Sequence, residues 1–273
     1  MYKMVLSDLD ETLLVNHHVP AFNQEAIREA RAKGAQFVVA TGRAYNMIGE
    51  ILKEIGTYDQ AGEYSICFNG GLILENKDHR VLHFKGLDYE LAQELFDKGA
   101  KYDVCVLVFT LDCCYIYHAD PSEVQRKTEQ KATFKVMETY DLTPLKEEHI
   151  AKILFMKKDM DYLKKIAADM AEQFDGRVAR TFSSNRYLEL NAYGIDKGYG
   201  LHWLSDYLHI PPQEVIAIGD NYNDVPMIKE AGIGACVASA TDDIKALADY
   251  VCQHDYGDGA VKEVLETFIK EEN

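Results

Sequence analysis

The chain has 273 residues with a formal net charge of −16, and 47% of its residues are hydrophobic. This composition is ordinary for a globular domain, and no apolar run approaches the roughly 18 residues that a membrane-spanning helix needs. The acidic excess disfavours nucleic acid as a partner, because binding to nucleic acid depends on clustered Lys and Arg against phosphates.

The first third alternates short apolar runs with helix-like segments. Buried strands are expected over Met4–Leu6, Gln36–Ala40 and Ser65–Phe68. We expect a helix from Asn23, which can cap it, to about Lys33, and a second over about 44–55. Right-handed crossovers would keep the strands parallel.

From about Phe84 the pattern changes to neighbouring strand-like runs around amphipathic helices, which is typical of an α+β insert. Strands are expected near 104–109, 114–117, 152–156, 178–182 and 186–190, and helices near 88–99 and 159–174. Alternation then resumes with a helix from about Asp196 to Tyr207 and a strand from Val215. We therefore expect an α/β parallel-sheet core formed by residues 1–83 and 191–273, with an inserted α+β domain at 84–190.

The insert differs from the rest of the chain in charge. Residues 84–190 contain 16 Lys and Arg against 19 Asp and Glu, whereas the remainder contains 13 against 26. The nearly neutral insert is therefore the better surface for an anionic small molecule. A second anion site could be built from four of its arginines, although a solvated surface is the default for each: Arg126, Arg177, Arg180 and Arg186.

Acidic clusters directly follow the first strand and the Val215 strand. Asp8 and Asp10 follow the former, and Asp220 and Asp224 follow the latter. Because functional groups of a doubly wound sheet gather at the carboxyl ends of its strands, both clusters should reach one crevice. Such carboxylates favour Mg²⁺, a hard ion that binds carboxylate and phosphate oxygens. Zinc is disfavoured, since the six cysteines show no Cys-x-x-Cys or Cys/His spacing.

The pair Asp8 and Asp10 can divide a phosphoryl transfer between them. Asp8 could attack phosphorus to form an aspartyl-phosphate, and Asp10 could protonate the leaving oxygen and then activate water. Thr12 could orient Asp10 or bond across the loop. The alternative is that both carboxylates merely cap the following turn.

Two further residues are suited to holding a phosphate. Thr41 at the end of the second strand could donate its hydroxyl to a phosphate oxygen, with Gly42 allowing close backbone approach. Lys197 could place an ammonium on the same oxygens. Taken alone, Thr41 could be a helix cap and Lys197 a solvated surface residue.

Together these segments resemble the four motifs of the haloacid dehalogenase superfamily, in order and over the whole chain. The matching segments are Asp8-Leu9-Asp10-Glu11-Thr12, Thr41-Gly42-Arg43, Lys197 in Gly194-Ile195-Asp196-Lys197-Gly198, and Gly219-Asp220-Asn221-Tyr222-Asn223-Asp224. The insert, with Asn69-Gly70-Gly71, is similar to the cap of the Cof-like subfamily IIB phosphatases. Glu11 and Ser239 depart from the family pattern, which commonly has glycine at the first position and asparagine at the second.

The resemblance implies site roles. Asp8, Asp10, Thr41 and Lys197 would be catalytic. Mg²⁺ would be held by Asp8, the backbone carbonyl of Asp10 and Asp220, with Asp224 and Asn223 supporting it directly or through water. The residues expected to contact substrate or phosphate are Thr12, Gly42, Arg43, Asn69, Gly70 and Asn223.

We therefore expect a Mg²⁺-dependent phosphatase acting on a small phosphomonoester, a sugar phosphate or a phosphorylated cofactor. The alternatives are a sugar phosphomutase of the same superfamily, which would need a firm second phosphate site, and a non-enzymatic phosphoacceptor module, which would not need Asp10. The first strand begins so near the amino terminus that a signal peptide has no room, so we expect a cytoplasmic protein. We expect no nucleic acid, membrane or obligate protein partner.

Overall fold

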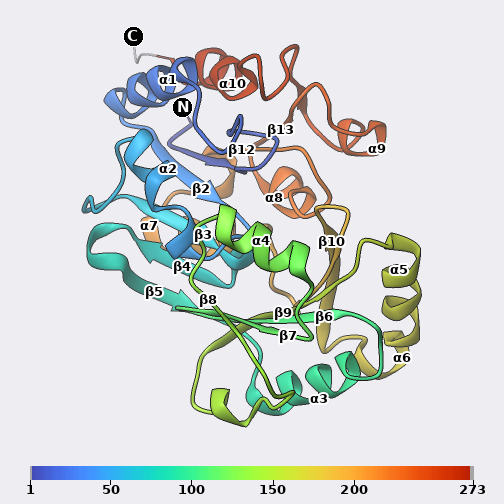
Figure 1. The fold of residues 1–273 in the computed structure, drawn as a ribbon. Coiled ribbons are helices and arrows are strands. Elements are labelled where there is room, and N and C mark those ends of the chain that lie inside the picture. Colours follow the sequence, from blue (N-terminus) through green and yellow to red (C-terminus); the bar gives the residue numbers. More distant parts are fainter. Residues whose placement is uncertain (1, 271–273) are drawn as a thin grey trace. The chain divides into compact units, whose positions relative to one another are not determined.

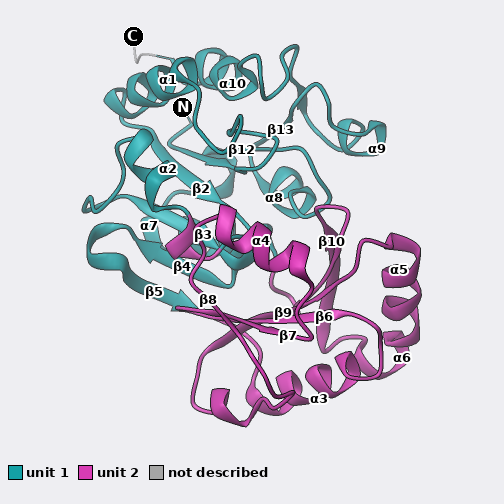
Figure 2. Cartoon of the chain, in the orientation of Figure 1, with its two compact units in different colours: residues 1–43, 48–84, 196–273 teal, residues 44–47, 85–195 magenta. Residues whose placement is uncertain are grey.

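The computed structural model describes residues 2–270 (Figure 1). The chain forms two compact units, coloured separately in Figure 2. Unit 1 comprises residues 1–43, 48–84 and 196–273, and unit 2 comprises residues 44–47 and 85–195. Among the described residues, no helix is both long and apolar enough to cross a bilayer.

Unit 1 is built on an eight-stranded sheet with the order β14-β13-β12-β1-β2-β3-β4-β5. The strands are β1 (Met4–Ser7), β2 (Gln36–Ala40), β3 (Tyr64–Cys67), β4 (Leu72–Glu75), β5 (Arg80–Phe84), β12 (Val215–Gly219), β13 (Ile233–Cys236) and β14 (Tyr250–Val251). The strands from β14 to β3 are parallel, and β4 and β5 add an antiparallel edge. The expected parallel-sheet core is confirmed.

The central strands are buried on both faces, which explains their continuous apolar sequences. Leu6 of β1 pairs with Val38 of β2 on one side and with Ala217 of β12 on the other. Leu201 and Leu204 of α7 (Lys197–Leu208) complete this core. The other helices of unit 1 are α1 (Ala21–Ala32), α2 (Gly49–Glu54), α8 (Val225–Glu230), α9 (Asp242–Lys245) and α10 (Ala260–Phe268), with 3₁₀ turns at Phe68–Gly70, Lys77–His79 and Pro212–Glu214.

The expected helix cap at Asn23 is wrong. Helix α1 starts two residues earlier, at Ala21, with Pro20 in the N-cap position. The Asn23 side chain instead donates to the Leu13 carbonyl (3.5 Å) and accepts from the Lys262 N–H (3.2 Å). It is fully buried where α1 and α10 lie side by side (Figure 1). Asn23 thus ties two helices together, a tertiary role that its local sequence does not reveal.

The expected continuous helix over 44–55 is also wrong. A 3₁₀ turn at Tyr45–Met47 precedes α2, and the chain leaves unit 1 after Arg43 and returns at Ile48. The two halves of this segment therefore belong to different units. One regular helix cannot serve both packing requirements.

Unit 2 contains a six-stranded sheet with the order β10-β11-β9-β6-β7-β8. Its strands are β6 (Cys105–Thr110), β7 (Cys114–Tyr117), β8 (Phe134–Val136), β9 (Ile150–Met156), β10 (Val178–Ser183) and β11 (Tyr187–Ala192). Only the β7 and β8 pair is parallel. The helices are α3 (Tyr89–Gly99), α4 (Pro121–Glu129), α5 (Met160–Asp169) and α6 (Ala171–Phe174), with a 3₁₀ turn at Thr143–Leu145.

Within unit 2, α4 covers one face of the sheet, and α3 and α5 lie on the other (Figure 1). Phe96 of α3 packs its ring edge-on against Tyr117 of β7, with the centroids 4.7 Å apart. Helix α4 was not expected from the sequence, although its start is well marked. Asp120 accepts the Ser122 N–H at 2.8 Å, and Pro121 occupies the first turn, where its missing N–H costs nothing.

Candidate active site

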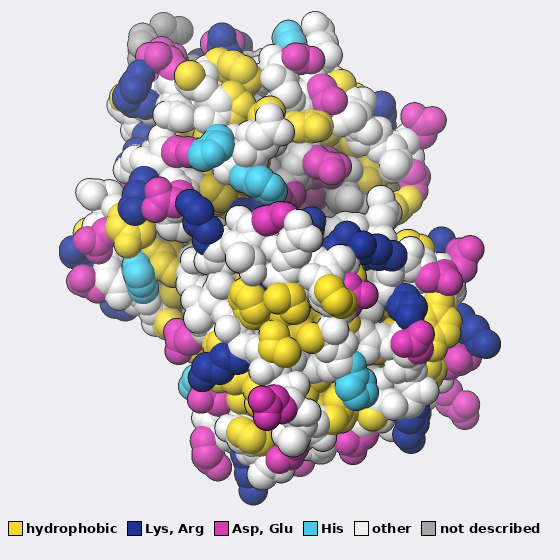
Figure 3. Space-filling view, in the orientation of Figure 1, with side chains coloured by type: hydrophobic (Ala, Val, Ile, Leu, Met, Phe, Trp, Pro, Cys, Tyr) yellow, Lys and Arg dark blue, Asp and Glu magenta, His cyan; other side chains and the backbone are white. Residues whose placement is uncertain are grey.

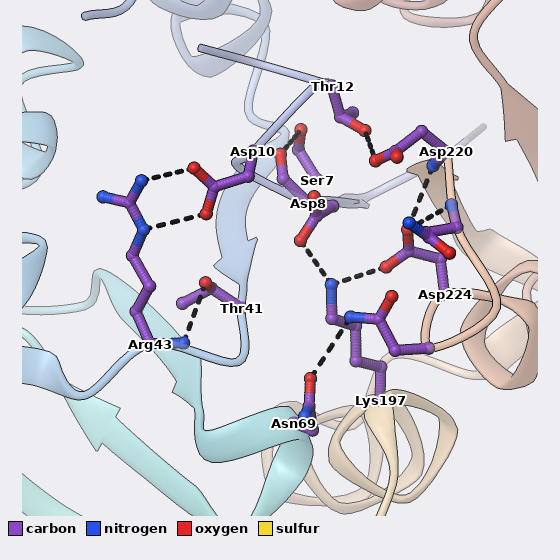
Figure 4. Close-up of polar contacts among 12 residues, drawn as sticks. Ser7, Asp8, Asp10, Thr12, Thr41, Arg43, Asn69, Lys197, Asp220 and Asp224 are labelled. Atoms are coloured by element: carbon purple, nitrogen blue, oxygen red, sulfur yellow. Dashed lines mark hydrogen bonds and ion pairs between the residues drawn. The ribbon is translucent and has the colours of Figure 1, made fainter. Parts of the chain in front are cut away.

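The site begins at the end of β1, in unit 1 (Figure 4). The backbone N–H of Asp8 donates to the Ile218 carbonyl at 3.0 Å, which fixes Asp8 against β12. The Asp8 side chain is buried, with only Oδ1 held by a hydrogen bond among the described residues, from Lys197. One carboxylate oxygen of Asp8 is therefore positioned by a cation while the other is left for chemistry.

Lys197 is the first residue of α7 and is fully buried. Asp196 caps this helix by accepting the Tyr199 N–H at 2.8 Å, so the start of the helix is fixed. The Lys197 ammonium donates to the carboxylates of both Asp8 and Asp224. Burial opposes the charge on Lys197, but the two carboxylates outweigh it and raise its pKa above the ordinary value. A solvated surface lysine is excluded.

Asp224 organises the loop that follows β12. Its Oδ2 accepts the backbone N–H groups of Asp220 and Asn221, both at 3.0 Å, while its Oδ1 accepts from Lys197. A Cβ on Gly219 would lie 2.4 Å from the Asp224 side chain, so only glycine allows this close approach. Both oxygens of Asp224 are thus committed to holding other parts of the site.

The Asp220 side chain is held by a residue of the loop that follows β1. The Thr12 hydroxyl donates to its Oδ1 at 2.8 Å, which joins the loop after β1 to the loop after β12. Of the two roles considered for Thr12, the structure shows the bond across the loop and no bond to Asp10.

Three carboxylates converge at this point. One ligand oxygen each of Asp8, Asp220 and Asp224 lies within 4.8 Å of the others. Burial, only partly opposed by Lys197, raises the pKa of Asp8 to about 7, and burial together with repulsion from Asp8 raises that of Asp220 to about 8. A single ammonium does not balance this charge. The all-oxygen donor set and the surplus negative charge fit a hard divalent cation.

Asp10 points to a different partner. Its carboxylate receives a two-pronged interaction from Arg43, with Nε donating at 2.9 Å and a terminal nitrogen to the other oxygen. The backbone N–H of Arg43 in turn donates to the Thr41 hydroxyl at 3.1 Å. Arg43, expected to contact phosphate, is therefore also a partner of the expected acid/base residue.

The segment after β3 contributes Asn69, which lies below the other site residues in Figure 4. Asn69 has a positive φ of 53°, and its N–H donates to the Thr41 carbonyl at 2.9 Å. Its side-chain oxygen accepts from the Asn223 amide at 3.3 Å. Gly70, with a φ of 98°, packs so closely that a Cβ would lie 2.1 Å from the Asp196 carbonyl oxygen. A Cβ on Gly42 would touch Asn69 at 3.1 Å.

The structure brings the expected residues of all four motifs into one neighbourhood of unit 1. The sequence motifs did not reveal the ion pair of Arg43 with Asp10. The two departures from the family pattern also become clear. Glu11 adopts a left-handed φ of 60°, a conformation that favours glycine. Ser239, which lies between β13 and α9, donates to Asp255, which lies between β14 and α10.

Known proteins support this reading of the fold and the motifs. Residues 5–265 match the haloacid dehalogenase-like hydrolase family. The 5-amino-6-(5-phospho-D-ribitylamino)uracil phosphatase YcsE of Bacillus subtilis is 25% identical over 263 residues, covering 96% of this chain and 94% of that protein.

Solved structures agree. The crystal structure of a haloacid dehalogenase-like hydrolase from Bacteroides thetaiotaomicron has a TM-score of 0.86 at 26% identity, covering 98% of this chain and 99% of that one. The subclass IIB sugar phosphatase BT4131 shares the fold, with a TM-score of 0.82 at 19% identity and coverage of 98% and 100%.

The chain belongs to the haloacid dehalogenase-like hydrolase family. The expected membership, fold and assignment as an enzyme of this family, a phosphoric monoester hydrolase, are confirmed. The cluster of Asp8, Asp220 and Asp224 could hold the divalent metal that this superfamily typically uses.

Proposed function

We propose that this hydrolase cleaves a small phosphomonoester through an aspartyl-phosphate on Asp8, with Mg²⁺ at the carboxylate cluster. The observation that carries the proposal is the placement of Asp8, which is buried at the end of β1 between Lys197 and the acidic loop after β12. Lys197 and a cation together would lower the repulsion between this carboxylate and a dianionic phosphate.

The first chemical step forms a bond between the free Asp8 oxygen and phosphorus while the bond from phosphorus to the leaving oxygen breaks. Asp10, in its protonated form, gives its proton to that oxygen. Arg43 holds both oxygens of Asp10 in the structure, so it would fix the orientation of this group. An alcohol leaves, and phosphate remains bonded to Asp8.

The second step reverses the role of Asp10. Its carboxylate takes a proton from water as the water oxygen attacks phosphorus, and the Asp8 carboxylate is released together with inorganic phosphate. Thr41, Asn69 and the neighbouring glycines would contact the phosphate oxygens. Asn223, which donates to Asn69, would hold that side chain in place.

Mg²⁺ would be held by Asp8, Asp220 and the backbone carbonyl of Asp10. When bound, the ion supplies charge neutralisation at the phosphate and keeps Asp8 ionised near neutral pH. Thr12 would orient Asp220 for this role through its 2.8 Å hydrogen bond. Asp224 would act mainly by positioning, because both of its oxygens already bind Lys197 and the loop amides.

We further propose that residues 84–190, most of unit 2, form the cap that selects the substrate, and that the substrate is a sugar phosphate or a phosphorylated cofactor. The name of the YcsE relative, which describes a phosphorylated ribityl compound as its substrate, supports this class. The six cysteines are free and buried, which suits a reducing compartment, and we propose a cytosolic location.

The experiment is phosphate release from a panel of sugar phosphates, nucleotides and phosphorylated cofactors, with and without Mg²⁺, for the wild type and Asp8→Asn. We expect metal-dependent release that is abolished by Asp8→Asn. Asp59→Asn is the matched control, because Asp59 lies in the same unit but pairs with Lys77 at the surface. Full activity in Asp8→Asn would rule out the aspartyl-phosphate route.

A second measurement assigns Asp10. With p-nitrophenyl phosphate the leaving group needs no proton, so Asp10→Asn should still complete the first step but not the second. We expect a burst of p-nitrophenolate stoichiometric with enzyme, followed by slow turnover and a phosphorylated Asp8 detectable by mass spectrometry. Steady turnover at the wild-type rate without a burst would contradict the assignment of Asp10 as acid and base.

A further inference from the structure

Unit 2 buries a group of charged side chains that the proposed chemistry does not use. They lie on the α4 face of its sheet and are called here the α4 cluster: Glu123 and Lys127 of α4, Lys152 of β9, and Tyr187 and Glu189 of β11. Each is at least nine-tenths buried. Burying five polar or charged groups together is costly unless they satisfy one another, so this arrangement calls for an explanation.

The contacts within the α4 cluster are specific. Glu123 accepts the Tyr187 hydroxyl at 2.8 and 2.9 Å and lies 3.2 Å from the Lys127 ammonium. Lys152 donates to Glu189 at 2.7 Å. Both ammonium groups also lie over the ring of Phe109, at 5.5 and 5.6 Å from its centroid. Each buried acid therefore already has one buried lysine of its own.

Two arginines add positive charge at the margin of the α4 cluster. Arg186 follows the tight β10–β11 turn, in which Ser184 and Asn185 both have positive φ, and its guanidinium lies 3.5 Å from Glu123. Arg126 of α4 has its Nε buried without a hydrogen-bond partner among the described residues. Both guanidiniums act on Tyr187, where they oppose the rise in its pKa that burial and Glu123 cause.

The other two arginines considered from the sequence are engaged elsewhere. Arg177 forms a two-pronged pair with Glu94, at 3.0 and 2.7 Å, and Arg180 pairs with Asp175 at 3.1 Å. They are therefore matched to acids of their own. Across the face drawn in Figure 3, Lys and Arg side chains are likewise interspersed with Asp and Glu side chains.

The charges of the α4 cluster and its two arginines do not balance. Lys127 and Lys152 offset Glu123 and Glu189, and the charges of Arg126 and Arg186 remain. We propose that Arg126 and Arg186 form an anion site in unit 2 that binds a phosphate group. Guanidinium groups present several donors in a planar array and bind phosphate oxygens in pairs. The buried Glu123 holds Arg186 from one side, and Tyr187 in turn donates to Glu123, while the exposed part of Arg186 faces solvent.

The two sources of such a group are free inorganic phosphate and the ester of a small metabolite. None of its residues belongs to the carboxylate cluster of unit 1, so binding at the two places can be measured separately. The Arg43 guanidinium, which pairs with Asp10, offers a separate reporter of binding at the candidate active site.

The experiment follows the Nε–Hε resonances of the full-length protein labelled with ¹⁵N-arginine. It is titrated with inorganic phosphate, with glucose 6-phosphate in the Asp8→Asn protein to prevent turnover, and with sodium chloride at equal ionic strength. We expect saturable shifts of the Arg126 and Arg186 signals with one or both phosphates, and none at Arg177. Arg186→Gln should weaken binding read at Arg126 by about tenfold or more. Arg177→Gln, the matched control, should leave it unchanged.

The outcomes separate this site from the proposed function. Shifts confined to Arg43 would overturn the anion site while leaving phosphate binding in unit 1 intact. Shifts at Arg126 and Arg186 without any at Arg43 would support the anion site and argue against the candidate active site. Equal shifts of Arg126, Arg186 and Arg177 that sodium chloride reproduces would mean ionic screening and would refute the proposal.

Discussion

Replacing Asp224 by asparagine tests the central geometry of the site with almost no change in shape. Asp224 uses Oδ1 to accept from Lys197 and Oδ2 to accept two backbone N–H groups, those of Asp220 and Asn221. Asparagine has only one acceptor oxygen. If that oxygen faces the loop, its NH₂ group points at the Lys197 ammonium, and if it is flipped, the backbone amides of Asp220 and Asn221 lose their acceptor.

The size of the effect follows from this count of donors and acceptors. Losing a hydrogen bond to a buried charged group costs about 1.5–3 kcal/mol. Lys197 keeps Asp8 as a partner, so the loss stays below that of an unpaired buried charge. If the same energy is lost at the transition state, kcat/KM falls about 10- to 100-fold. The unfolding midpoint should fall by about 3–10 °C.

The assay combines thermal unfolding with Mg²⁺-dependent phosphate release from the best substrate of the panel. Asp243→Asn is the matched control, since Asp243 is an exposed acid in the same part of the chain that accepts the Tyr222 hydroxyl. It should leave both quantities nearly unchanged. If Asp224→Asn behaves like this control in activity and stability, the coupling of Lys197 to the loop through Asp224 is refuted.

Two further predictions concern backbone packing and metal linkage. Gly70→Ala should destabilise unit 1 by about 3 kcal/mol or more in denaturant unfolding, because its Cβ would meet the Asp196 carbonyl oxygen at 2.1 Å. Gly34 also has a positive φ but open space around it, so Gly34→Ala should cost only about 1 kcal/mol. Equal costs for the two variants would contradict the clash at Gly70. Metal-free protein should lose stability as pH rises from about 4 to 8, since Asp8 and Asp220, with pKa values raised to about 7 and 8, bind protons that the unfolded chain releases. Mg²⁺ should therefore stabilise the protein more above pH 8 than near about pH 5. If the stabilisation by Mg²⁺ does not depend on pH, or if Asp220→Asn leaves it unchanged, the ion does not bind at these carboxylates.

The neighbourhood of the candidate site could be predicted from the sequence because parallel strands deliver their carboxyl ends to one edge. Asp8, Thr41 and Asp220 each stand directly after a strand that the apolar pattern marks clearly. Lys197 follows a helix cap, Asp196, which the sequence also indicates. These positions depend on local patterns and a simple topological rule, so no tertiary detail is needed to find them.

The pairings inside the site could not be predicted in the same way. The choice of Arg43 as the partner of Asp10, and of Thr12 as the partner of Asp220, depends on side-chain reach across loops. Asn23 shows the same limit in the fold, because a residue with a strong capping preference serves two helices instead. Such contacts join residues far apart in sequence, and no periodic pattern encodes them.

The position of β1 between β2 and β12 also orders events during synthesis. Leu6 leaves the ribosome well before its partner Ala217 in β12, which follows only after unit 2 has been made. Until then β1 has an open, apolar edge, which is a hazard for aggregation. During this interval unit 2 can fold while the β12 side of β1 is still unpaired. A chain that stops before β12 should therefore be insoluble as well as inactive.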